Sequence, residues 1–399
     1  MAAWLAIIGI GEDGWDALTG AAKALVTGAA LIVGGARHLA LIPPSAGMRL
    51  PWKSPLAETL PEIARYRGQR VAVLASGDPL CYGVGALLAR NFSPEEMIVL
   101  PRPSAFSLAG ARLLWPIEDC VTISLHGRSL DRLRLHLTPG ARIMALTNDG
   151  NAPAQIARLL TAAGWGASPL TVLEHLDGAS ERRVAATAET WCAERCADLN
   201  IVALRCEAGP AARPWSRRAG LPDDAFRHDG QITKRSVRVA TLAALAPLPG
   251  ELLWDIGAGS GAIAIEWLRA DERLRAIAIE RDDARAAIIA ENAAMLGVPE
   301  LTIEHGTAPE ALIGLAPPDA IFIGGGVGDA TIWDAAWPAL RPGGRLIANA
   351  VTVTGEAELL RRHATLGGEL QRIATAHAEG SGFWRPAMAV TQLTVRKPR

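Results

Sequence analysis

Short apolar runs separated by longer amphipathic stretches organise the second half of the chain. Five of these runs are predicted strands, at residues 252–256, 276–279, 301–303, 320–323 and 345–350. The stretches between them, such as 284–296 and 329–340, have the length and pattern of helices. Regular alternation of strand and helix predicts a parallel sheet with right-handed crossovers. Two last runs, 370–376 and 387–395, leave no room for a helix and predict an antiparallel hairpin at one edge.

The first half also alternates between strands and helices, and it begins with an apolar run. That run, residues 1–9, lacks the basic region of a signal peptide and is too short to span a bilayer, so it predicts a first strand. Residues 207–225 are rich in Pro, Arg and Gly, have no sustained apolar period and predict a linker. We therefore expect two α/β domains, at residues 1–206 and 226–399.

The amino-acid composition limits the possible binding partners and the expected cellular compartment. Forty basic and forty-one acidic residues leave a net charge of −1, so no overall field favours nucleic acid or an anionic membrane as a partner. The five cysteines are scattered, and no His or second Cys pair completes a zinc site, so we expect no metal. Without a disulfide framework, the reducing cytoplasm is the expected compartment.

A glycine-rich turn after the first strand of the second half carries the strongest chemical signal. The segment reads Leu253-Trp-Asp-Ile-Gly-Ala-Gly-Ser-Gly261, and Glu280 closes the next strand. Glycines let the backbone turn tightly and approach a ligand, and an acid ~20 residues further on can hold ribose hydroxyls. This arrangement predicts a nucleoside-binding crossover, although the glycines alone also fit the fingerprint of NAD-binding domains.

Three neighbouring features separate these alternatives. Asp255 precedes the first glycine, where a carboxylate can hold the turn and reach a ligand amine. Residues 341–346, Arg-Pro-Gly-Gly-Arg-Leu, make a tight turn into a strand, and residues 306–311, Gly-Thr-Ala-Pro-Glu-Ala, end the third strand. With these features the second half resembles the class I methyltransferases that use S-adenosylmethionine (SAM), which have a Rossmann-like seven-stranded fold. The resemblance implies that the cofactor is bound by Thr233, Asp255, Gly257, Ala258, Gly259, Ser260, Gly261, Glu280, Thr307 and Ala308.

Two further segments narrow this resemblance. Residues 229–238, Asp-Gly-Gln-Ile-Thr-Lys-Arg-Ser-Val-Arg, and residues 321–326, Ile-Phe-Ile-Gly-Gly-Gly, are similar to the CbiT-type enzymes of cobalamin synthesis. Those enzymes methylate carbon 15 of a corrin precursor and remove carbon dioxide from the acetate side chain on carbon 12. The resemblance places Thr233 over the cofactor. Thr307 departs from the family, which often has Asp there, so the implied adenine contact is weakened.

The first half contains a misleading glycine pattern. Gly9-Ile-Gly-Glu-Asp-Gly14 matches the dinucleotide fingerprint literally, but the next strand ends in Gly-Gly-Ala-Arg37, so the ribose acid is missing. Six segments instead resemble, in order, the tetrapyrrole methylases (class III SAM enzymes), and among them the CbiE type: residues 8–19, 31–35, 75–83, 103–107, 146–149 and 174–178.

The most specific of these segments is Ser76-Gly-Asp-Pro79, a turn fixed by its proline. The resemblance implies that this turn exposes backbone groups to the methionine part of SAM, with Asp78 beside the amine. It implies a second cofactor site at Ser76, Gly77, Asp78, Ser104 and Ala105. Two departures stand out: Arg102 replaces the usual Gly before Ser104, so that loop is expected to bend differently, and Glu12-Asp13 replaces a Gly-Pro pair in the first loop.

Together the two halves resemble the fused precorrin methyltransferases of aerobic cobalamin synthesis. The resemblance implies methylation of carbons 5 and 15 of precorrin-6Y and decarboxylation of the carbon 12 acetate, giving precorrin-8X, with SAM bound in each domain. The partner is then an anionic tetrapyrrole, and we expect a homo-oligomer. Two alternatives stay open: a SAM-binding scaffold with only one active half, and a methyltransferase that acts on another small molecule.

Such a substrate calls for cationic groups that hold its carboxylates. Lys234, Arg235, Arg238 and His228 flank the second cofactor site and are the candidates there. Lys234 and Arg238 are four positions apart, so on the helix expected after Thr233 they share one face. Arg37, Arg102 and Arg128 are the candidates in the first half. His38, His126 and His228 are candidates for moving protons, because histidine is the residue type suited to that role near neutral pH.

Overall fold

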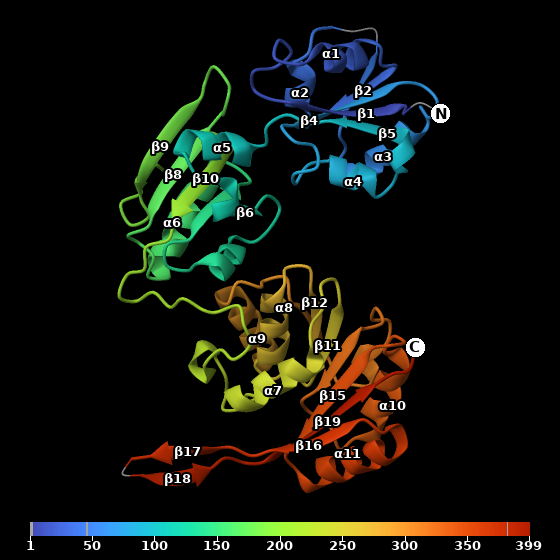
Figure 1. Cartoon of the computed structure of the whole chain (residues 1–399), viewed down its shortest axis with the longest axis vertical. Helices are drawn as coiled ribbons and strands as arrows, with labels where there is room; N and C mark the ends of the chain where they lie inside the picture. The colour runs from blue at the N-terminus through green and yellow to red at the C-terminus, as the bar shows by residue number, and fades with distance from the viewer. Residues whose placement is uncertain (1–2, 45–46, 381) are drawn as a thin grey trace. The chain divides into compact units, whose positions relative to one another are not determined.

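The computed structural model describes residues 3–44, 47–380 and 382–399 (Figure 1). The chain divides into two compact units, of which the first comprises residues 1–128 and 138–213 and the second residues 129–137 and 214–399. Within the described residues, no helix is long and apolar enough to cross a membrane.

A parallel sheet with the order β3-β2-β4-β1-β5 forms one lobe of the first unit. Its strands are β1 (Leu5–Ile10), β2 (Leu31–Gly34), β3 (Met48–Pro51), β4 (Val71–Ser76) and β5 (Met97–Leu100). β1 is buried at every position, and its alternate residues pack on opposite faces of the sheet. One face is covered by α1 (Gly20–Thr27) and α2 (Ala36–Ala40), and the other by α3 (Leu60–Ala64) and α4 (Gly85–Ala89) (Figure 1).

A mixed sheet with the order β6-β7-β10-β8-β9 forms the other lobe of the first unit. Its strands are β6 (Cys120–Ser124), β7 (Arg142–Leu146), β8 (Pro169–Glu174), β9 (Arg182–Thr187) and β10 (Asn200–Arg205). Phe106 and Ala109 of α5 (Ala105–Leu113) pack on Met144 and Ile201 of this sheet. The remaining helix is α6 (Ala152–Ala162), and short 3-10 turns are η1 (Leu56–Thr59), η2 (Pro94–Glu96) and η3 (Ile117–Asp119).

The second unit contains the predicted parallel sheet. Its first five strands are β11 (Leu252–Ile256), β12 (Arg275–Glu280), β13 (Thr302–His305), β14 (Ala320–Ile323) and β15 (Arg345–Ala350), and they pair in parallel as expected. The helices are α7 (Arg235–Leu245), α8 (Ala262–Ala270), α9 (Asp283–Met295), α10 (Ala330–Ala339) and α11 (Val353–Leu366). The first three cover one face and the last two cover the other, around the buried Trp267 and Trp333 respectively. The 3-10 turns η5 (Asp223–Ala225) and η6 (Glu310–Leu312) complete the unit.

The predicted antiparallel edge is confirmed. The sheet order is β13-β12-β11-β14-β15-β19-β16, with β19 (Val390–Arg396) antiparallel to both β15 and β16 (Glu369–Ile373). The hairpin between them, formed by β17 (Ala376–Glu379) and β18 (Phe383–Pro386), was not predicted, and it extends from the sheet in Figure 1. All described side chains of β18 are exposed, so the segment lacks the apolar alternation by which a half-buried strand is recognised.

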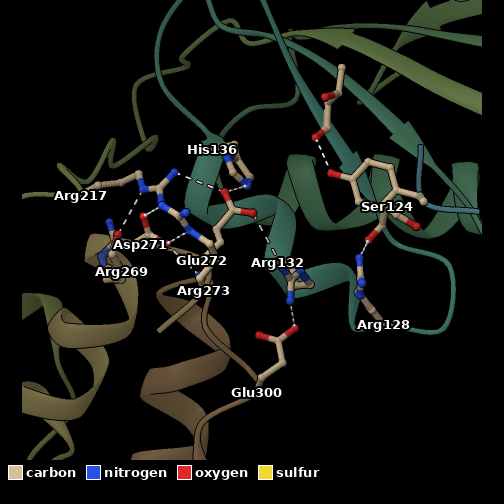
Figure 2. Close-up of polar contacts among 12 residues, drawn as sticks. Ser124, Arg128, Arg132, His136, Arg217, Arg269, Asp271, Glu272, Arg273 and Glu300 are labelled. Carbon is tan, nitrogen blue, oxygen red and sulfur yellow. Dashed lines mark hydrogen bonds and ion pairs between the residues drawn. The ribbon is translucent and has the colours of Figure 1, made fainter. Parts of the chain in front are cut away.

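A segment from the middle of the first half belongs to the second unit. Residues 129–137 contain the 3-10 helix η4 (Leu130–His136), a further element of that unit. Arg132 forms an ion pair with Glu300 and lies 3.9 Å from Glu272, as Figure 2 shows. These contacts attach η4 to the turns that follow α8 and α9.

The turn after α9 also fits this segment closely. Gly297 has a φ of 82°, and a Cβ atom there would come within 2.4 Å of the backbone nitrogen of Leu135. His136 is buried, and its Nε2 lies 3.7 Å from Glu272 (Figure 2). Backbone packing and charged contacts therefore both hold residues 129–137 in the second unit.

Arg238 of α7 forms a buried ionic cluster that ties the start of the second unit to α8. Its side chain is fully buried; Nε donates to Glu266 Oε1 at 2.5 Å and Nη1 to Asp223 Oδ1 at 3.1 Å. The carbonyl oxygens of Leu221 and Thr233 accept further hydrogen bonds from the same guanidinium group. A buried charge is tolerated only with such partners, because its desolvation costs several kcal/mol.

Arg238→Ala should therefore lower the free energy of unfolding of the second unit by roughly 3–5 kcal/mol, because it leaves Glu266 buried without its partner. Urea unfolding, with hydrogen exchange followed across α7 and α8, measures this effect. Lys234→Ala is the matched control: its exposed ammonium lies 3.8 Å from Asp223, and exposed pairs contribute at most about 1 kcal/mol. Equal effects of the two changes would contradict the assigned role of the buried cluster.

Candidate functional site

The glycine turn after β11 is built by close backbone approach. Gly257, Gly259 and Gly261 have φ values of 72°, 60° and 74°, which disfavour other residues. A Cβ atom on Gly257 would come within 2.7 Å of Gly325, in the turn that follows β14. The predicted segments 253–261 and 321–326 therefore lie together at the carboxyl ends of neighbouring strands, where ligands bind to open α/β sheets.

Asp255 is the clearest sign of a ligand in this turn. Its side chain is buried; Oδ2 accepts from the backbone nitrogen of Ala264 at 3.0 Å, but Oδ1 has no partner among the described residues. Burial, with a smaller effect from the nearby Glu280 carboxylate, raises the pKa of Asp255 to about 7. Buried polar atoms are nearly always hydrogen-bonded, so an unpaired carboxylate oxygen suits a ligand that brings an ammonium group. The amine of SAM fits this requirement.

Glu280 holds the glycine turn from the end of β12. Its Oε2 accepts from the nitrogen of Gly259 at 2.8 Å, and Oε1 accepts from the nitrogens of Arg281 and Asp282, each at 3.1 Å. A carboxylate can accept about four hydrogen bonds. One acceptor position is left for a ribose hydroxyl, so Glu280 can serve both the turn and a nucleoside.

The segment before α7 lies over the same turn. The carbonyl oxygen of Gln231 is 3.8 Å from the position of a Cβ atom on Gly259, and Thr233 follows two residues later. At the end of β13, Thr307 is exposed and Ala308 is buried, and Gly306 donates to the carbonyl oxygen of Glu280 at 3.0 Å. The structure thus places Thr233, Thr307 and Ala308 on segments next to the turn.

Asn292 is a site residue that the sequence analysis missed. It lies on α9, is fully buried, accepts from the backbone nitrogen of Arg227 at 2.8 Å and donates to the carbonyl oxygen of Ser260 at 2.9 Å. It therefore links the leading segment to the glycine turn, and the ion pair of Asp229 with Arg285 at 2.9 Å adds a second link. The available signal was an Asn on the helix face that Ile289 and Ala293 make apolar, because Asn is a poor helix former.

The expected carboxylate-binding cluster of the second unit needs a correction. Arg238 is buried in the ionic cluster described above, so its guanidinium group is not available to a substrate. The helical spacing of Lys234 and Arg238 suggested a shared surface, but Lys234 precedes the helix as its N-cap. Lys234, Arg235 and His228 are exposed, and the Nδ1 of His228 accepts from Gly230 at 3.1 Å.

In the first unit, three loops meet at the carboxyl ends of β1, β4 and β5. A Cβ atom on Gly9 would lie 1.9 Å from the carbonyl oxygen of Gly77, and one on Gly77 would lie 2.7 Å from that of Pro103. Asp78 Oδ1 accepts from Leu80 at 2.9 Å, which shapes the turn.

Ser104 and Ala105 begin helix α5, where the hydroxyl of Ser104 accepts from the nitrogen of Ser107 at 3.1 Å. The first two amide groups of this helix remain available to a ligand. All the residues predicted for the first cofactor site therefore lie on the loops that approach one another or on the strand and helix ends that border them.

The two departures from the tetrapyrrole methylase pattern pair with each other. Arg102 forms an ion pair with Asp13, while its backbone nitrogen donates to Gly77 at 3.1 Å. Glu12 pairs with Arg37 and lies 2.9 Å from the Nδ1 of His175. The acidic first loop is thus fixed on both sides, and Arg37 and Arg102 already have protein partners. Arg128 donates to the carbonyl oxygen of Ser124 at 3.1 Å (Figure 2).

Comparison with known proteins gives two family models that match in order. One is described as tetrapyrrole (corrin/porphyrin) methylases and matches residues 5–191; the other is described as a precorrin methyltransferase domain and matches residues 224–397. Among solved structures, the C-terminal domain of precorrin-6Y C5,15-methyltransferase from Rhodobacter capsulatus is 44% identical, covering 46% of this chain and 100% of that one, with a TM-score of 0.43.

Two curated relatives match along nearly the whole chain. A precorrin-6Y C(5,15)-methyltransferase [decarboxylating] from Sinorhizobium sp. is 51% identical over 98% of this chain and 95% of the relative. A protein of the same name from Mycobacterium tuberculosis (strain CDC 1551 / Oshkosh) is 41% identical over 98% and 99%. The chain therefore belongs to the precorrin-6Y C5,15-methyltransferase (decarboxylating) family, whose members are SAM-dependent enzymes of cobalamin synthesis.

Proposed function

We propose that the chain methylates carbons 5 and 15 of precorrin-6Y and decarboxylates its carbon 12 acetate, with one SAM site in each unit. The second unit methylates carbon 15 and decarboxylates, in line with its CbiT-like segments, which leaves carbon 5 to the first unit. The observation that carries the proposal is the buried carboxylate of Asp255, with one unpaired oxygen beside the glycine turn.

In the second unit, the protein binds and orients rather than reacts. Bound SAM supplies an electrophilic methyl group. Asp255 would hold its amine, Glu280 would accept from a ribose hydroxyl, and the glycine turn would let the backbone come close. Positioning a ring carbon in line with that methyl group lowers the activation barrier by several kcal/mol, because the reactants have already lost rotational and translational freedom on binding.

The substrate carboxylates need cations that are free to meet them. In the second unit Lys234 and Arg235 are exposed beside the leading segment, so they are the candidates for this contact once Arg238 is excluded. Loss of carbon dioxide leaves an electron pair that the conjugated ring can absorb, so cations are needed to hold the other side chains rather than to take part in the bond cleavage.

In the first unit, the turn at Ser76, Gly77 and Asp78 and the start of α5 at Ser104 and Ala105 would hold the second SAM. In the sequence, Arg102, which changes the loop before Ser104, slightly favours the alternative of a scaffold with an inactive first half. Its backbone contact with Gly77 is kept, and its side chain has a partner in Asp13, which favours an intact site.

Assembly and compartment complete the proposal. A homo-oligomer is supported by Phe383 and Trp384, which are 79% and 72% exposed on the β17–β18 hairpin, since large apolar side chains gathered on a surface mark contact sites. All five cysteines are free thiols, as a reducing cytoplasm would keep them.

The full chain, incubated with SAM and precorrin-6Y, should give a product with two added methyl groups and one carbon dioxide lost, measured by mass spectrometry. Two equivalents of S-adenosylhomocysteine should appear for each macrocycle. A product with one added methyl group would favour the scaffold alternative, and no reaction with precorrin-6Y would favour another small-molecule substrate.

Asp78→Ala should abolish methylation at carbon 5 and leave methylation at carbon 15 and decarboxylation, because Asp78 belongs to the first unit alone. Asp255→Ala should do the reverse. Mass spectrometry with fragment assignment of the methyl positions separates the two products. If either variant, still folded by circular dichroism, lost both methyl groups, independent sites would be excluded.

The affinity of the second site for SAM should rise with pH. Without ligand, the carboxyl group of Asp255 has a pKa of about 7. The amine of SAM pairs with the ionised carboxylate, so Asp255 must lose a proton when SAM binds below that pH. Affinity should fall by up to about tenfold per pH unit below 7. Calorimetry between about pH 5.5 and 8 in the Asp78→Ala background measures this, and Asp255→Asn should remove the slope. A flat profile before that change would refute the assignment.

A further inference from the structure

A cluster of polar side chains lies at the carboxyl end of β4 in the first unit. His38 Nε2 lies 2.9 Å from Ser76 Oγ, and Arg37 Nη2 contacts both, at 3.0 Å from His38 and 2.9 Å from Ser76. Glu12, from the loop after β1, accepts from Arg37 and lies 2.9 Å from His175, which follows β8. The cluster therefore joins both lobes of the unit beside the proposed methionine-binding turn.

These contacts determine which nitrogen of His38 carries the hydrogen. A guanidinium group can only donate, so the Nε2 facing Arg37 must be the unprotonated acceptor. Nδ1 then carries the hydrogen, and this atom is buried without a partner among the described residues. Burial, and then the charge of Arg37, lower the pKa of His38 to about 4, against the opposing effect of Glu12. The imidazole is therefore neutral at pH 7, and the single electron pair of its Nε2 faces both Arg37 and Ser76.

The hydroxyl oxygen of Ser76 has one electron pair left that can accept a proton. A hydroxyl group has one hydrogen to donate and two electron pairs to accept with. Arg37 uses one pair, and the hydrogen is directed to the Nε2 of His38. Because Ser76 is exposed whereas the Nδ1 edge of His38 is buried, the remaining pair is the accessible end of a path that leads inward.

The reaction proposed for the first unit releases a proton, and this step of the argument rests on that proposed function. Carbon 5 gains a methyl group as the bond between that group and sulfur breaks, with the electron pair staying on sulfur. Carbon 5 is then tetrahedral, bonded to both its hydrogen and the methyl group, and the positive charge is shared by the conjugated ring next to it. Breaking the bond between carbon 5 and its hydrogen returns an electron pair to the ring and neutralises it. A base must take the proton.

We propose that Ser76 is a catalytic residue of the first site and that it passes the proton from carbon 5 to His38. Ser76 Oγ accepts the proton as its own hydrogen moves to Nε2, so the hydroxyl group is restored and an imidazolium forms. The hydrogen bond from Arg37 to Nε2 is lost in this step, and the one from Arg37 to Ser76 Oγ is kept. Arg37 and Glu12 are positioning residues: Arg37 fixes the hydroxyl and the ring, and Glu12 holds Arg37. His175 contacts Glu12 and has no part in the path.

Ser76→Ala in the full chain should lower kcat for carbon 5 methylation at least about 100-fold, the usual contribution of a positioned base. KM for the macrocycle and the calorimetric affinity for SAM should change less than about threefold, since the backbone of the turn is kept. Ser76→Thr keeps the hydroxyl and should restore most of the rate. Ser93→Ala, at an exposed serine of the same unit, is the matched control and should resemble the unchanged protein.

Two measurements distinguish proton transfer through Ser76 and His38 from a purely structural role of these residues. With deuterium on carbon 5, Ser76→Ala and His38→Gln should each raise the kinetic isotope effect on carbon 5 methylation, because proton loss becomes rate-limiting. Nitrogen NMR of the protein without SAM should show Nε2 of His38 unprotonated at neutral pH. An unchanged isotope effect, or a hydrogen found on Nε2, would overturn the proposal.

Methylation at carbon 15 in the same samples serves as the internal reference. If carbon 15 and carbon 5 are methylated normally in Ser76→Ala, the proton path is wrong and the proposed function stands. If the unchanged protein does not methylate carbon 5 at all, the proposed function of the first unit fails instead.

Discussion

Two backbone turns can touch only where neither carries a Cβ atom at the point of contact, and both candidate sites depend on this constraint. In the second unit Gly257 lies against Gly325, and in the first unit Gly9 lies against Gly77. In each case the glycines lie at or just after the carboxyl ends of neighbouring strands of a parallel sheet. The close approach brings the polar residues after those strands, such as Asp255 or Asp78, into one small region. A side chain at Gly257 or Gly9 would push the facing segment away before it altered the chemistry.

The parallel sheet of the second unit could be predicted from the sequence because its strands are buried on both faces. Such strands are continuous apolar runs, and residues 252–256, 320–323 and 345–350 coincide with the observed strands. The hairpin β17–β18 could not be found in the same way, since its described side chains are largely exposed and no core shapes its pattern. The apolar periodicity of a sequence arises from the burial of side chains, so a strand whose side chains are exposed shows no such periodicity.

The site residues could be predicted where their role follows from residue type and spacing in the sequence. They were harder to predict where their role depends on tertiary packing. Asp255 and Glu280 lie at the ends of their strands, as expected. Arg238 looked like a surface cation by helical spacing, but the neighbouring Glu266 and Asp223, distant in sequence, draw it into the interior. The pairing of Arg102 with Asp13 was likewise hidden, because a compensating ion pair across about 90 positions has no local signature.

The assignment of residues 129–137 to the second unit has a consequence for how the chain can be divided. The polypeptide passes between the units three times, after residues 128, 137 and 213, although it has only two units. A protease that cut only after residue 213 would leave η4 covalently joined to one unit and packed into the other. Likewise, two genes made by splitting this one at the linker would give a second product without the segment that closes the turn at Gly297. The two units are therefore not joined simply end to end, because a segment within the first half belongs to the second unit. Separating them into two proteins would require a new surface where residues 129–137 pack at Gly297.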